Sequence, residues 1–516
     1  MLPEYKSEPM LDFARPDAEA GMRAALERVR SQFGAAYPLV IGGRRVTTPD
    51  TFESRNPADP SESVGRFSKA TAQHVQEAVA AAEKAFESWR WVPPEERANV
   101  LLRAAGILRR RRLEMNAAMV YEIGKNWNEA DGDTAEAIDF CDFYAREMIR
   151  WGGPQPLTPN PGENNVLEYI PLGVGVVIPP WNFPCAIAMG MTAATIVTGN
   201  SAVLKPASDT PLVAWKIFEI LEEAGVPPGV LNFLPGPGGV IGDALVDHPR
   251  VRFVAFTGSM EVGIGINERA AKVQKGQVWL KRAILEMGGK DFTVVDEDAD
   301  LDQAVSGVYA GAFGFQGQKC SACSRAIVHE RLYDDFVERL ERRVGQMTIG
   351  PTEKKENYLG PVASPSAEKK ILEYIEVGKR EGRVVTGGAK HSGPGHFVQP
   401  TVFADVKPGA RIAQEEVFGP VLAVTKARSL EEEIAIANGT IYGLTGAYYG
   451  RDRARIAEAK RRLHVGNLYI NRKCTGALVG IHPFGGFNMS GTDSKAGGRD
   501  YLGLFLQAKS IAELVG

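Results

Sequence analysis

VLEYIPLGVGVVIPP, residues 166–180, marks the point at which the character of the chain changes. Its apolar and β-branched residues are interrupted by Pro-Leu-Gly, which predicts a strand, a turn and a second strand. Three more short runs of this kind follow, each ending near a Gly, Pro or Ser, with helix-forming sequence between them. They are GNSAVLKPA (199–207), GVLNFLPG (229–236) and VRFVAFTGS (251–259).

The same alternation extends outward in both directions. Residues 70–150 place apolar side chains at helical spacing between charges, which predicts amphipathic helices. On the other side, DFTVVD (291–296) and RAIVHE (325–330) read as strands with a helix between them. Strands that alternate with helices indicate parallel βαβ units, so we expect an α/β protein of two lobes with a cleft between them.

The composition limits the classes of function. Of 516 residues, 44% are hydrophobic and 24% are charged, and the net charge of −3 provides no basic surface for nucleic acid or membrane. The uncharged stretch 169–204 is broken by prolines, and its apolar part, 185–198, is too short to cross about 30 Å of hydrocarbon. The N-terminus lacks the layout of a signal peptide. The five cysteines are an odd, sparse set, which indicates free thiols and a cytoplasmic location.

Four loops follow predicted strands, at the edge where open α/β sheets bind ligands. They are residues 179–184, 205–208, 236–239 and 256–263. GPGG at 236–239 is not a G-x-G-x-x-G fingerprint, because Ile241 stands where the third glycine belongs. Gly258 and Ser259 open a predicted helix, whose backbone N–H groups favour a phosphate. An ordinary strand-to-helix turn is the alternative.

LEMGGKD, residues 285–291, places Glu286 at the end of an apolar strand and before two glycines. A carboxylate in such a position is partly desolvated, which raises its pKa and suits it to general-base catalysis. A solvated glutamate in a loop is the alternative.

GFQGQKCSACSR, residues 314–325, contains two of the five cysteines. A structural zinc site needs four thiolate or imidazole ligands. The chain has no second C-x-x-C, and its seven histidines form no H-x-x-x-H pair, so we expect no metal. A thioredoxin-type redox pair usually lies early in a small domain. The third interpretation is a thiolate nucleophile at Cys320, stabilised by Lys319 and nearby N–H groups, while a buried small hydrophobe is the plain alternative.

Five motifs occur in one order along the chain: PWNFP (180–184), LEMGGK (285–290), Gly-Gln-x-Cys (317–320), EEVFGP (415–420) and PFGGFNMSG (483–491). In this order, with Cys320 following Glu286 by 34 residues, they resemble the NAD(P)-dependent aldehyde dehydrogenase superfamily over residues 40–510. The resemblance implies a Rossmann-like cofactor-binding domain, an α/β catalytic domain and a small β flap for oligomerisation. It also implies that Cys320 attacks an aldehyde, that Asn182 and the Cys320 N–H form the oxyanion hole, and that Glu286 activates water.

The resemblance also implies NAD as the cofactor. The residues that it assigns to the cofactor are Ile178, Trp181, Lys205, Ser208, Gly236, Gly258, Ser259, Glu416 and Phe418. Lys205 and Glu416 hold the two riboses in this assignment, and Phe418 packs near the nicotinamide ribose. Ser208 departs from the family's KPAE, and the loss of that negative charge leaves room for the 2′-phosphate of NADP.

A narrower resemblance concerns the substrate. NRKCTGALVGIHPFGG (471–486), EIGKNW (122–127) and AEAIDF (135–140) resemble the branch that oxidises L-glutamate γ-semialdehyde in the second step of proline catabolism. The branch's substrate-binding residues fall on Glu136, Phe183, Ser321, Gly476, Ala477 and Phe484. Ser321 and the N–H groups of Gly476 and Ala477 anchor the substrate carboxylate in this assignment, since small residues let the main chain approach an anion. Glu136 meets the ammonium through water, and the two phenylalanines flank the aliphatic chain.

The resemblance finally implies a division of the chain. Residues 1–153 and 171–287 form the NAD-binding domain, 288–490 the catalytic domain, and 154–170 with 491–516 an oligomerisation segment. We expect 154–170 to form a hairpin and the apolar C-terminus to be covered in a homodimer or a larger homo-oligomer. The competing functions are another semialdehyde dehydrogenase, such as one for succinate semialdehyde, a non-catalytic protein of this fold, and a C-x-x-C metal or redox module.

Overall fold

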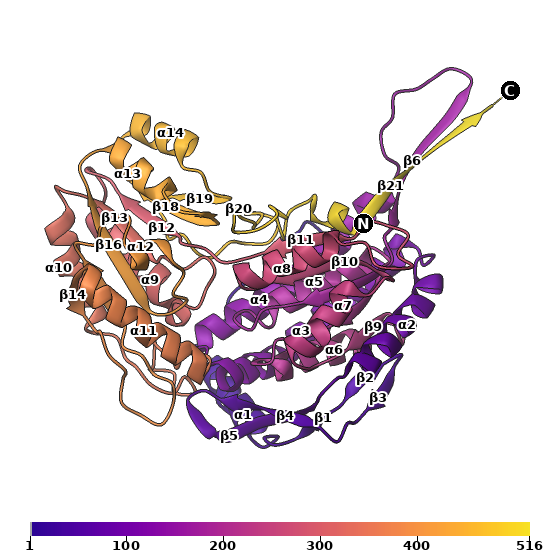
Figure 1. The fold of residues 1–516 in the computed structure, drawn as a ribbon, viewed down its shortest axis with the longest axis horizontal. Coiled ribbons are helices and arrows are strands. Elements are labelled where there is room, and N and C mark those ends of the chain that lie inside the picture. Colours follow the sequence, from indigo (N-terminus) through magenta and orange to yellow (C-terminus); the bar gives the residue numbers. More distant parts are fainter. Residues whose placement is uncertain (1–2, 516) are drawn as a thin grey trace.

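The structure is a computed structural model that describes residues 3–515. Two α/β lobes lie side by side, and a thin two-stranded ribbon projects from one of them (Figure 1). Each lobe contains a seven-stranded sheet. The prediction of two α/β lobes is therefore confirmed.

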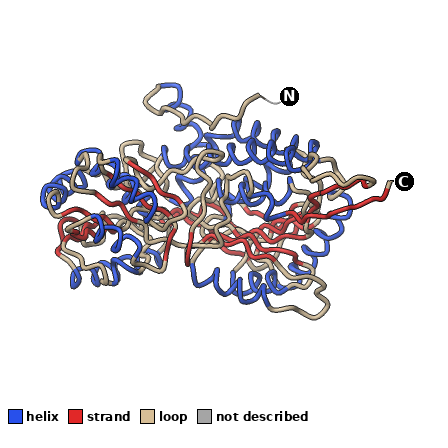
Figure 2. The backbone as a smooth tube through the Cα atoms, turned by 90° about the horizontal axis from the view of Figure 1, so that it is seen from above, coloured by secondary structure: helices blue, strands red, loops and turns tan. Residues whose placement is uncertain are grey.

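The first lobe is built on a sheet of the order β11-β10-β7-β8-β9-β2-β3, in which the strands from β11 to β9 are parallel. Its strands are β2 (Leu39–Ile41), β3 (Arg44–Val46), β7 (Val174–Ile178), β8 (Ser201–Leu204), β9 (Leu231–Phe233), β10 (Val251–Thr257) and β11 (Arg282–Glu286). Helices cover both faces of the strands (Figure 2). A smaller sheet of β1 (Ala36–Tyr37), β5 (Asp59–Ser68) and β4 (Thr51–Asn56) lies at its side.

The helices of this lobe are α1 (Pro16–Arg30), α2 (Ala72–Trp89), α3 (Pro94–Ile123), α4 (Trp127–Gly152), α5 (Ala186–Val197), α6 (Pro211–Glu223), α7 (Asp243–Asp247) and α8 (Met260–Ala271). The amphipathic helices predicted over residues 70–150 are confirmed as α2, α3 and α4. Gly124 ends α3 with a φ of 70°, a left-handed conformation that glycine adopts without strain. The Asn126 side chain then accepts the N–H of Glu129 and starts α4. These two caps reverse the chain, so that α3 and α4 pack together and bury Leu101 and Ile138, at about 1.5–3 kcal/mol per side chain.

The second lobe has a sheet of the order β14-β15-β16-β13-β12-β18-β19, parallel except for β14. Its strands are β12 (Phe292–Val295), β13 (Arg325–His329), β14 (Arg383–Thr386), β15 (Thr401–Ala404), β16 (Val421–Ala427), β18 (Thr445–Tyr449) and β19 (Asn467–Ile470). Its helices are α9 (Leu301–Phe313), α10 (Tyr333–Val344), α11 (Pro365–Glu381), α12 (Arg411–Gln414), α13 (Leu430–Asn438) and α14 (Arg453–Arg462). A short pair, β17 (Tyr442–Gly443) and β20 (Phe487–Asn488), joins it to the C-terminal segment.

The lobes meet through opposite edges of their sheets. In the first sheet the loops that follow β7, β8 and β10 lie at the carboxyl edge, where the sequence places the ligand loops. In the second sheet the segments that precede β13 and β16 lie at the amino edge, and they contain Cys320 and Glu416. The Asn182 side chain joins the two edges by donating to the carbonyl of Gln318 at 3.0 Å.

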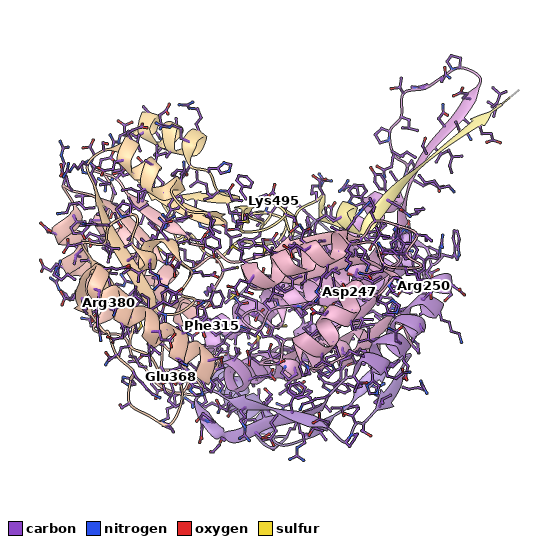
Figure 3. The ribbon with its side chains drawn as sticks, viewed as in Figure 1. Asp247, Arg250, Phe315, Glu368, Arg380 and Lys495 are labelled. Atoms are coloured by element: carbon purple, nitrogen blue, oxygen red, sulfur yellow. The ribbon has the colours of Figure 1, made fainter. Side chains whose placement is uncertain are left out.

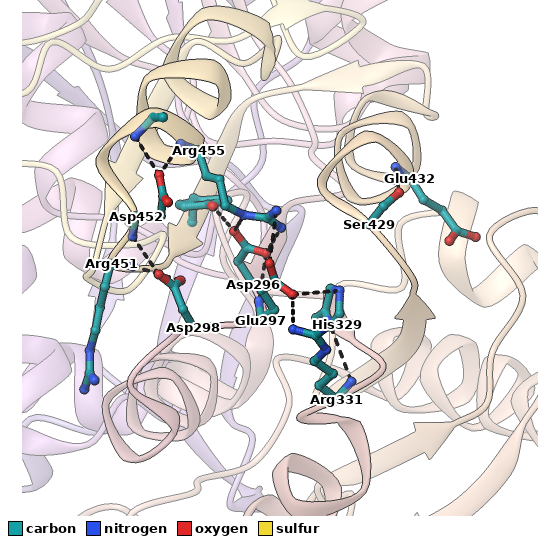
Figure 4. A network of polar contacts seen from close by, with 12 residues as sticks. Asp296, Glu297, Asp298, His329, Arg331, Ser429, Glu432, Arg451, Asp452 and Arg455 are labelled. Atoms are coloured by element: carbon teal, nitrogen blue, oxygen red, sulfur yellow. Dashed lines mark hydrogen bonds and ion pairs between the residues drawn. The ribbon is translucent and has the colours of Figure 1, made fainter.

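The carboxyl edge of the second sheet carries a network of ion pairs instead of loops for a ligand (Figure 4). Asp296, whose side chain is fully buried, follows β12 and accepts from Arg455 Nε at 2.6 Å and from the Tyr448 hydroxyl. Asp298 accepts the backbone N–H groups of Arg451 (3.0 Å) and Asp452 (2.7 Å), and these residues follow β18. The network fixes α14 against the ends of the strands.

The projecting ribbon corrects the prediction for residues 154–170. These residues do not form a hairpin. A single strand, β6 (Glu163–Pro171), pairs antiparallel with β21 (Leu506–Leu514) at the other end of the chain. Residues 491–505 lie against the first lobe, where Tyr501, Leu502 and Phe505 are buried. None of the helices within residues 3–515 is long and apolar enough to cross a membrane.

Candidate active site

The loop that carries Cys320 has a strained backbone. After α9, Phe315 and Gln316 adopt φ values of 49° and 56°, a region that side chains rarely occupy. The buried Gln316 amide donates to the carbonyls of Gly124 (3.1 Å) and Pro361 (2.7 Å), which holds this conformation. Gly317 needs its missing side chain, because a Cβ there would lie 2.3 Å from the carbonyl oxygen of Gly419. The Gly- and Gln-rich segment before Cys320 thus forms a rigid loop at the junction of the lobes.

Cys320 is half-buried beside three carboxylates. Burial raises the pKa of its thiol, and the charges of Asp291, Glu286 and Glu416 raise it further. The expected stabilisation of the thiolate by Lys319 is wrong in this geometry, because the Lys319 ammonium pairs with Glu129 at 2.7 Å. Burial and the neighbouring carboxylates both favour the neutral form of the Cys320 thiol.

Cys323 occupies a different environment from Cys320. It is 1% exposed and belongs to the hydrophobic core of the second lobe together with Cys474. Its sulfur lies 3.2 Å from the hydroxyl of Thr293. All five cysteines are free thiols, and residues 3–515 contain no group of His, Cys, Asp and Glu side chains able to hold a metal ion.

Asn182 and Glu286 reach the Cys320 loop from the carboxyl edge of the first sheet. Asn182 follows β7, is 4% exposed and uses one amide N–H on Gln318, which leaves the other available. Glu286 is the last residue of β11, and burial raises its pKa to about 8. Its Oε1 accepts from the hydroxyl of Ser494, whereas its buried Oε2 has no partner among the described residues.

Ser494 was not anticipated from the sequence. It lies in the C-terminal segment that runs along β11, where the N–H of Met287 donates to the carbonyl of Ser490 at 2.8 Å. The Ser494 hydroxyl and the charge of Lys495 both lower the pKa of Glu286 against the effect of burial. Figure 3 shows Lys495 and Phe315 at the junction of the lobes. No local motif marks Ser494, because its partner is 208 residues away in the chain.

Two predicted cofactor residues meet across the junction of the lobes. The rings of Trp181 and Phe418 meet edge to face, with centroids 5.3 Å apart. Glu416 accepts the N–H of Gly289 at 2.9 Å. Lys205 is 5% exposed, and within residues 3–515 its ammonium makes one hydrogen bond, to the carbonyl of Pro206 at 3.2 Å. Burial lowers the pKa of Lys205 to about 8.

The other predicted cofactor residues lie along the carboxyl edge of the first sheet. Ser259 caps α8 by accepting the N–H of Val262, and Gly258 precedes it. Ile178 ends β7, and Ser208 is exposed after β8. Gly236 differs from the rest, because its missing Cβ faces the backbone of Ala70 at 3.3 Å and serves packing. A charged donor, a half-buried carboxylate, an aromatic pair and a capped helix start together fit a dinucleotide.

The predicted substrate residues lie in two groups. Glu136, on α4, is half-buried, and burial raises its pKa to about 8. The Phe183 ring lies 3.9 Å from the ammonium of Lys125, which is fully buried and pairs with Asp133 at 3.0 Å. Lys125 is a further residue that the sequence did not single out.

The second group consists of Ser321, Gly476, Ala477 and Phe484, and Ser321 is 8% exposed. Its carbonyl accepts from the thiol of Cys474 at 3.4 Å, and this contact ties the loop containing Gly476 and Ala477 to the Cys320 loop. Phe484 lies on the neighbouring segment, where its N–H donates to Ala496.

The arrangement of a thiol, an amide and a buried carboxylate between two α/β lobes defines a class of enzyme. The sequence profile described as the aldehyde dehydrogenase family matches residues 45–511, and the chain belongs to this family. Its relatives share a narrower name within this family. The chain is similar to a 1-pyrroline-5-carboxylate dehydrogenase of Geobacillus sp. (strain WCH70), with 56% identity over all of both chains, and to that of Geobacillus thermodenitrificans, with 55%. A crystal structure of 1-pyrroline-5-carboxylate dehydrogenase from Thermus with bound NAD has a TM-score of 0.98 and 51% identity, covering 99% of both chains.

Proposed function

We propose that this enzyme oxidises L-glutamate γ-semialdehyde, the open form of Δ1-pyrroline-5-carboxylate, to L-glutamate with NAD. The observation that carries the proposal is the full-length identity of 56% with a protein named 1-pyrroline-5-carboxylate dehydrogenase. The placement of Cys320, Asn182 and Glu286 at one junction supports the reaction type. This is the second step of proline catabolism.

Cys320 forms the first covalent bond. The Cys320 thiol gives its proton to solvent water, its sulfur attacks the aldehyde carbon, and the electron pair of the carbonyl double bond moves to the oxygen, which becomes an oxyanion. The free N–H of the Asn182 amide and the backbone N–H of Cys320 stabilise this oxyanion. The resulting thiohemiacetal would become a thioester by losing a hydride to NAD held by the residues assigned below.

Glu286 serves the second half of the reaction. The ionised fraction of Glu286 grows as the pH rises toward its pKa of about 8, and this carboxylate takes a proton from water while the resulting hydroxide attacks the thioester carbon. The carbon–sulfur bond breaks, Cys320 is released, and the carboxylate product leaves. The unpartnered Oε2 is the oxygen available for this proton.

NAD supplies a hydride acceptor when it is bound. We assign its contacts to Trp181, Lys205, Ser259, Glu416 and Phe418, whose donors and carboxylate fit the two riboses and the phosphates. Ser208 brings no negative charge to the adenosine end, so NADP remains a second cofactor for the same site.

The substrate assignment is tested by initial rates on two aldehydes. We expect a higher kcat/KM for glutamate semialdehyde than for succinate semialdehyde, because only the former carries an α-amino group for Glu136. Rates with NAD and with NADP are measured in the same assay. Equal or better turnover of succinate semialdehyde contradicts the substrate, and Cys320→Ala retaining NADH production contradicts the nucleophile.

We further propose a homodimer, or a larger assembly built from dimers, in the cytoplasm. The ribbon of β6 and β21 supports this, since Leu514 is 82% exposed in a single chain. In this proposal residues 1–153 and 171–287 bind the cofactor, 288–490 carry catalysis, and 154–170 with 491–516 contribute to assembly. Light scattering at micromolar concentration that gives the mass of one chain contradicts the assembly.

A further inference from the structure

Arg472 lies in the segment between β19 and the proposed carboxylate anchor. Its Nη2 donates to the carbonyl oxygens of Thr475 at 3.2 Å and of Gly476 at 2.9 Å. One nitrogen therefore holds two consecutive carbonyls. The guanidinium also lies 4.5 Å from the centroid of the Tyr469 ring, which fixes its position at the sheet edge.

The two carbonyls belong to the peptide units whose N–H groups are the proposed anchor. In a planar trans peptide the carbonyl and the following N–H point in opposite directions. The Thr475 carbonyl thus sets the direction of the Gly476 N–H, and the Gly476 carbonyl sets that of the Ala477 N–H. A side chain that pulls both carbonyls to one side directs both donors to the other.

The loop has a left-handed residue at the anchor, which glycine adopts without strain. Gly476 has a φ of 80°, and a Cβ built on it would lie 3.4 Å from the Lys473 side chain and 3.8 Å from Arg472 Nη2. Among the described residues, the other hydrogen bonds that hold this loop lie outside the peptide units Thr475–Gly476 and Gly476–Ala477. Cys474 binds the Ser321 carbonyl at 3.4 Å, and the N–H of Leu478 donates to His482 Nδ1 at 3.2 Å.

We propose that Arg472 is a positioning residue for substrate carboxylate recognition. It orients the N–H groups of Gly476 and Ala477 toward the anion, and its charge polarises the two carbonyls so that these N–H groups become stronger donors. This inference rests on the proposed function, because it assumes a substrate with a carboxylate at that end.

The test compares glutamate semialdehyde with butanal, an aldehyde of similar chain length without a carboxylate. We expect Arg472→Met to raise KM for glutamate semialdehyde by about 10- to 100-fold, with kcat changed less than about threefold. The kcat/KM for butanal stays at the wild-type value. Arg472→Lys, which keeps the charge and can donate to both carbonyls, recovers part of the loss.

Arg461→Met is the matched control, because Arg461 is exposed in the same lobe and pairs with Glu458 at 2.7 Å. We expect it to behave as wild type on both aldehydes. An equal loss on both aldehydes with Arg472→Met overturns the positioning role and indicates a general effect on folding. An unchanged KM for glutamate semialdehyde overturns it as well. A wild-type enzyme that does not distinguish the two aldehydes contradicts the proposed function instead.

Discussion

The carboxyl edges of the two sheets have the same backbone geometry and opposite chemistry. In the first sheet this edge carries Asn182, Lys205, Ser259 and Glu286, and the Asn182 amide reaches the Cys320 loop. In the second sheet the same edge is closed by the ion pairs around Asp296, and the reactive Cys320 lies at the amino edge. Ligands of open α/β sheets usually bind at the carboxyl edge. The first lobe follows this rule. In the second lobe the carboxyl edge is occupied by ion pairs that stabilise the fold.

The half-buried Glu286 and the buried Asp296 show the difference most directly. Glu286 has one hydrogen-bonded oxygen and one without a partner among the described residues, so burial dominates and its pKa rises to about 8. Burial also acts on Asp296, but the hydrogen bonds from Arg455 and Tyr448 outweigh it and lower the pKa. Glu286 therefore binds a proton more readily than an ordinary carboxylate does, whereas Asp296 stays ionised in its ion pair with Arg455.

The largest expected effect comes from removing the base. Glu286→Gln should lower steady-state kcat by about 10²- to 10⁴-fold, because thioester hydrolysis loses its general base. The burst of NADH in the first turnover should remain, since Cys320 still forms the thioester. Stopped-flow absorbance measures both phases. Loss of the burst together with kcat would mean that Glu286 is needed before the thioester forms.

The next effect concerns stability. Asp296→Asn should lower the free energy of unfolding by about 1–3 kcal/mol, because the buried Asp296 side chain loses its ion pair with Arg455, which is 25% exposed and keeps Glu297 as a partner at 3.3 Å. Urea denaturation measures the change, and kcat at 25 °C should stay close to wild type because Asp296 faces away from the junction. A fall in kcat comparable to that of Glu286→Gln would contradict the conclusion that the carboxyl edge of the second sheet serves stability and not catalysis.

The pH dependence of stability should run in opposite directions for the two carboxylates. Glu286 has a raised pKa in the folded state, so its contribution is lost as pH rises from about 4.5 through about 8. Asp296 has a lowered pKa, so its contribution is lost as pH falls below its ordinary 3.8. Unfolding free energies of the wild type and of Glu286→Gln across this pH range check the prediction for Glu286. The wild type should lose more stability than the variant as the pH rises. Parallel curves would contradict the raised pKa.

The smallest effect concerns the hydroxyl that supports the base. Ser494→Ala removes the hydrogen bond to Glu286 Oε1, so the pKa of Glu286 should rise further by about one unit or less. The midpoint of the kcat–pH profile should move upward by the same amount, with a few-fold loss of kcat near neutral pH. Ser366→Ala, at an exposed serine that contacts Ser364, is the control. An unmoved midpoint would show that Ser494 does not tune the base.

Much of this organisation could be predicted from the sequence. Strands and helices follow local periodicity, so β7 to β13 and α2 to α4 were found where the pattern placed them. The family motifs selected Cys320, Glu286 and Asn182. Partners distant in the chain could not be found in this way, because nothing near Ser494 or β21 indicates what it pairs with. Lys319 shows the converse error, since its position next to Cys320 in sequence hides the ion pair with Glu129.

The contact between Ser494 and Glu286 has a consequence for the order of events during synthesis. When β11 leaves the ribosome, the segment that holds its last residue has not been made, and the strand that completes the ribbon comes later still. Contacts of such separation form late in folding. A nascent chain can thus fold most of the first lobe while Glu286 still lacks its hydrogen bond from Ser494. Such an unfinished chain does not yet have the general base in the form that hydrolyses the thioester.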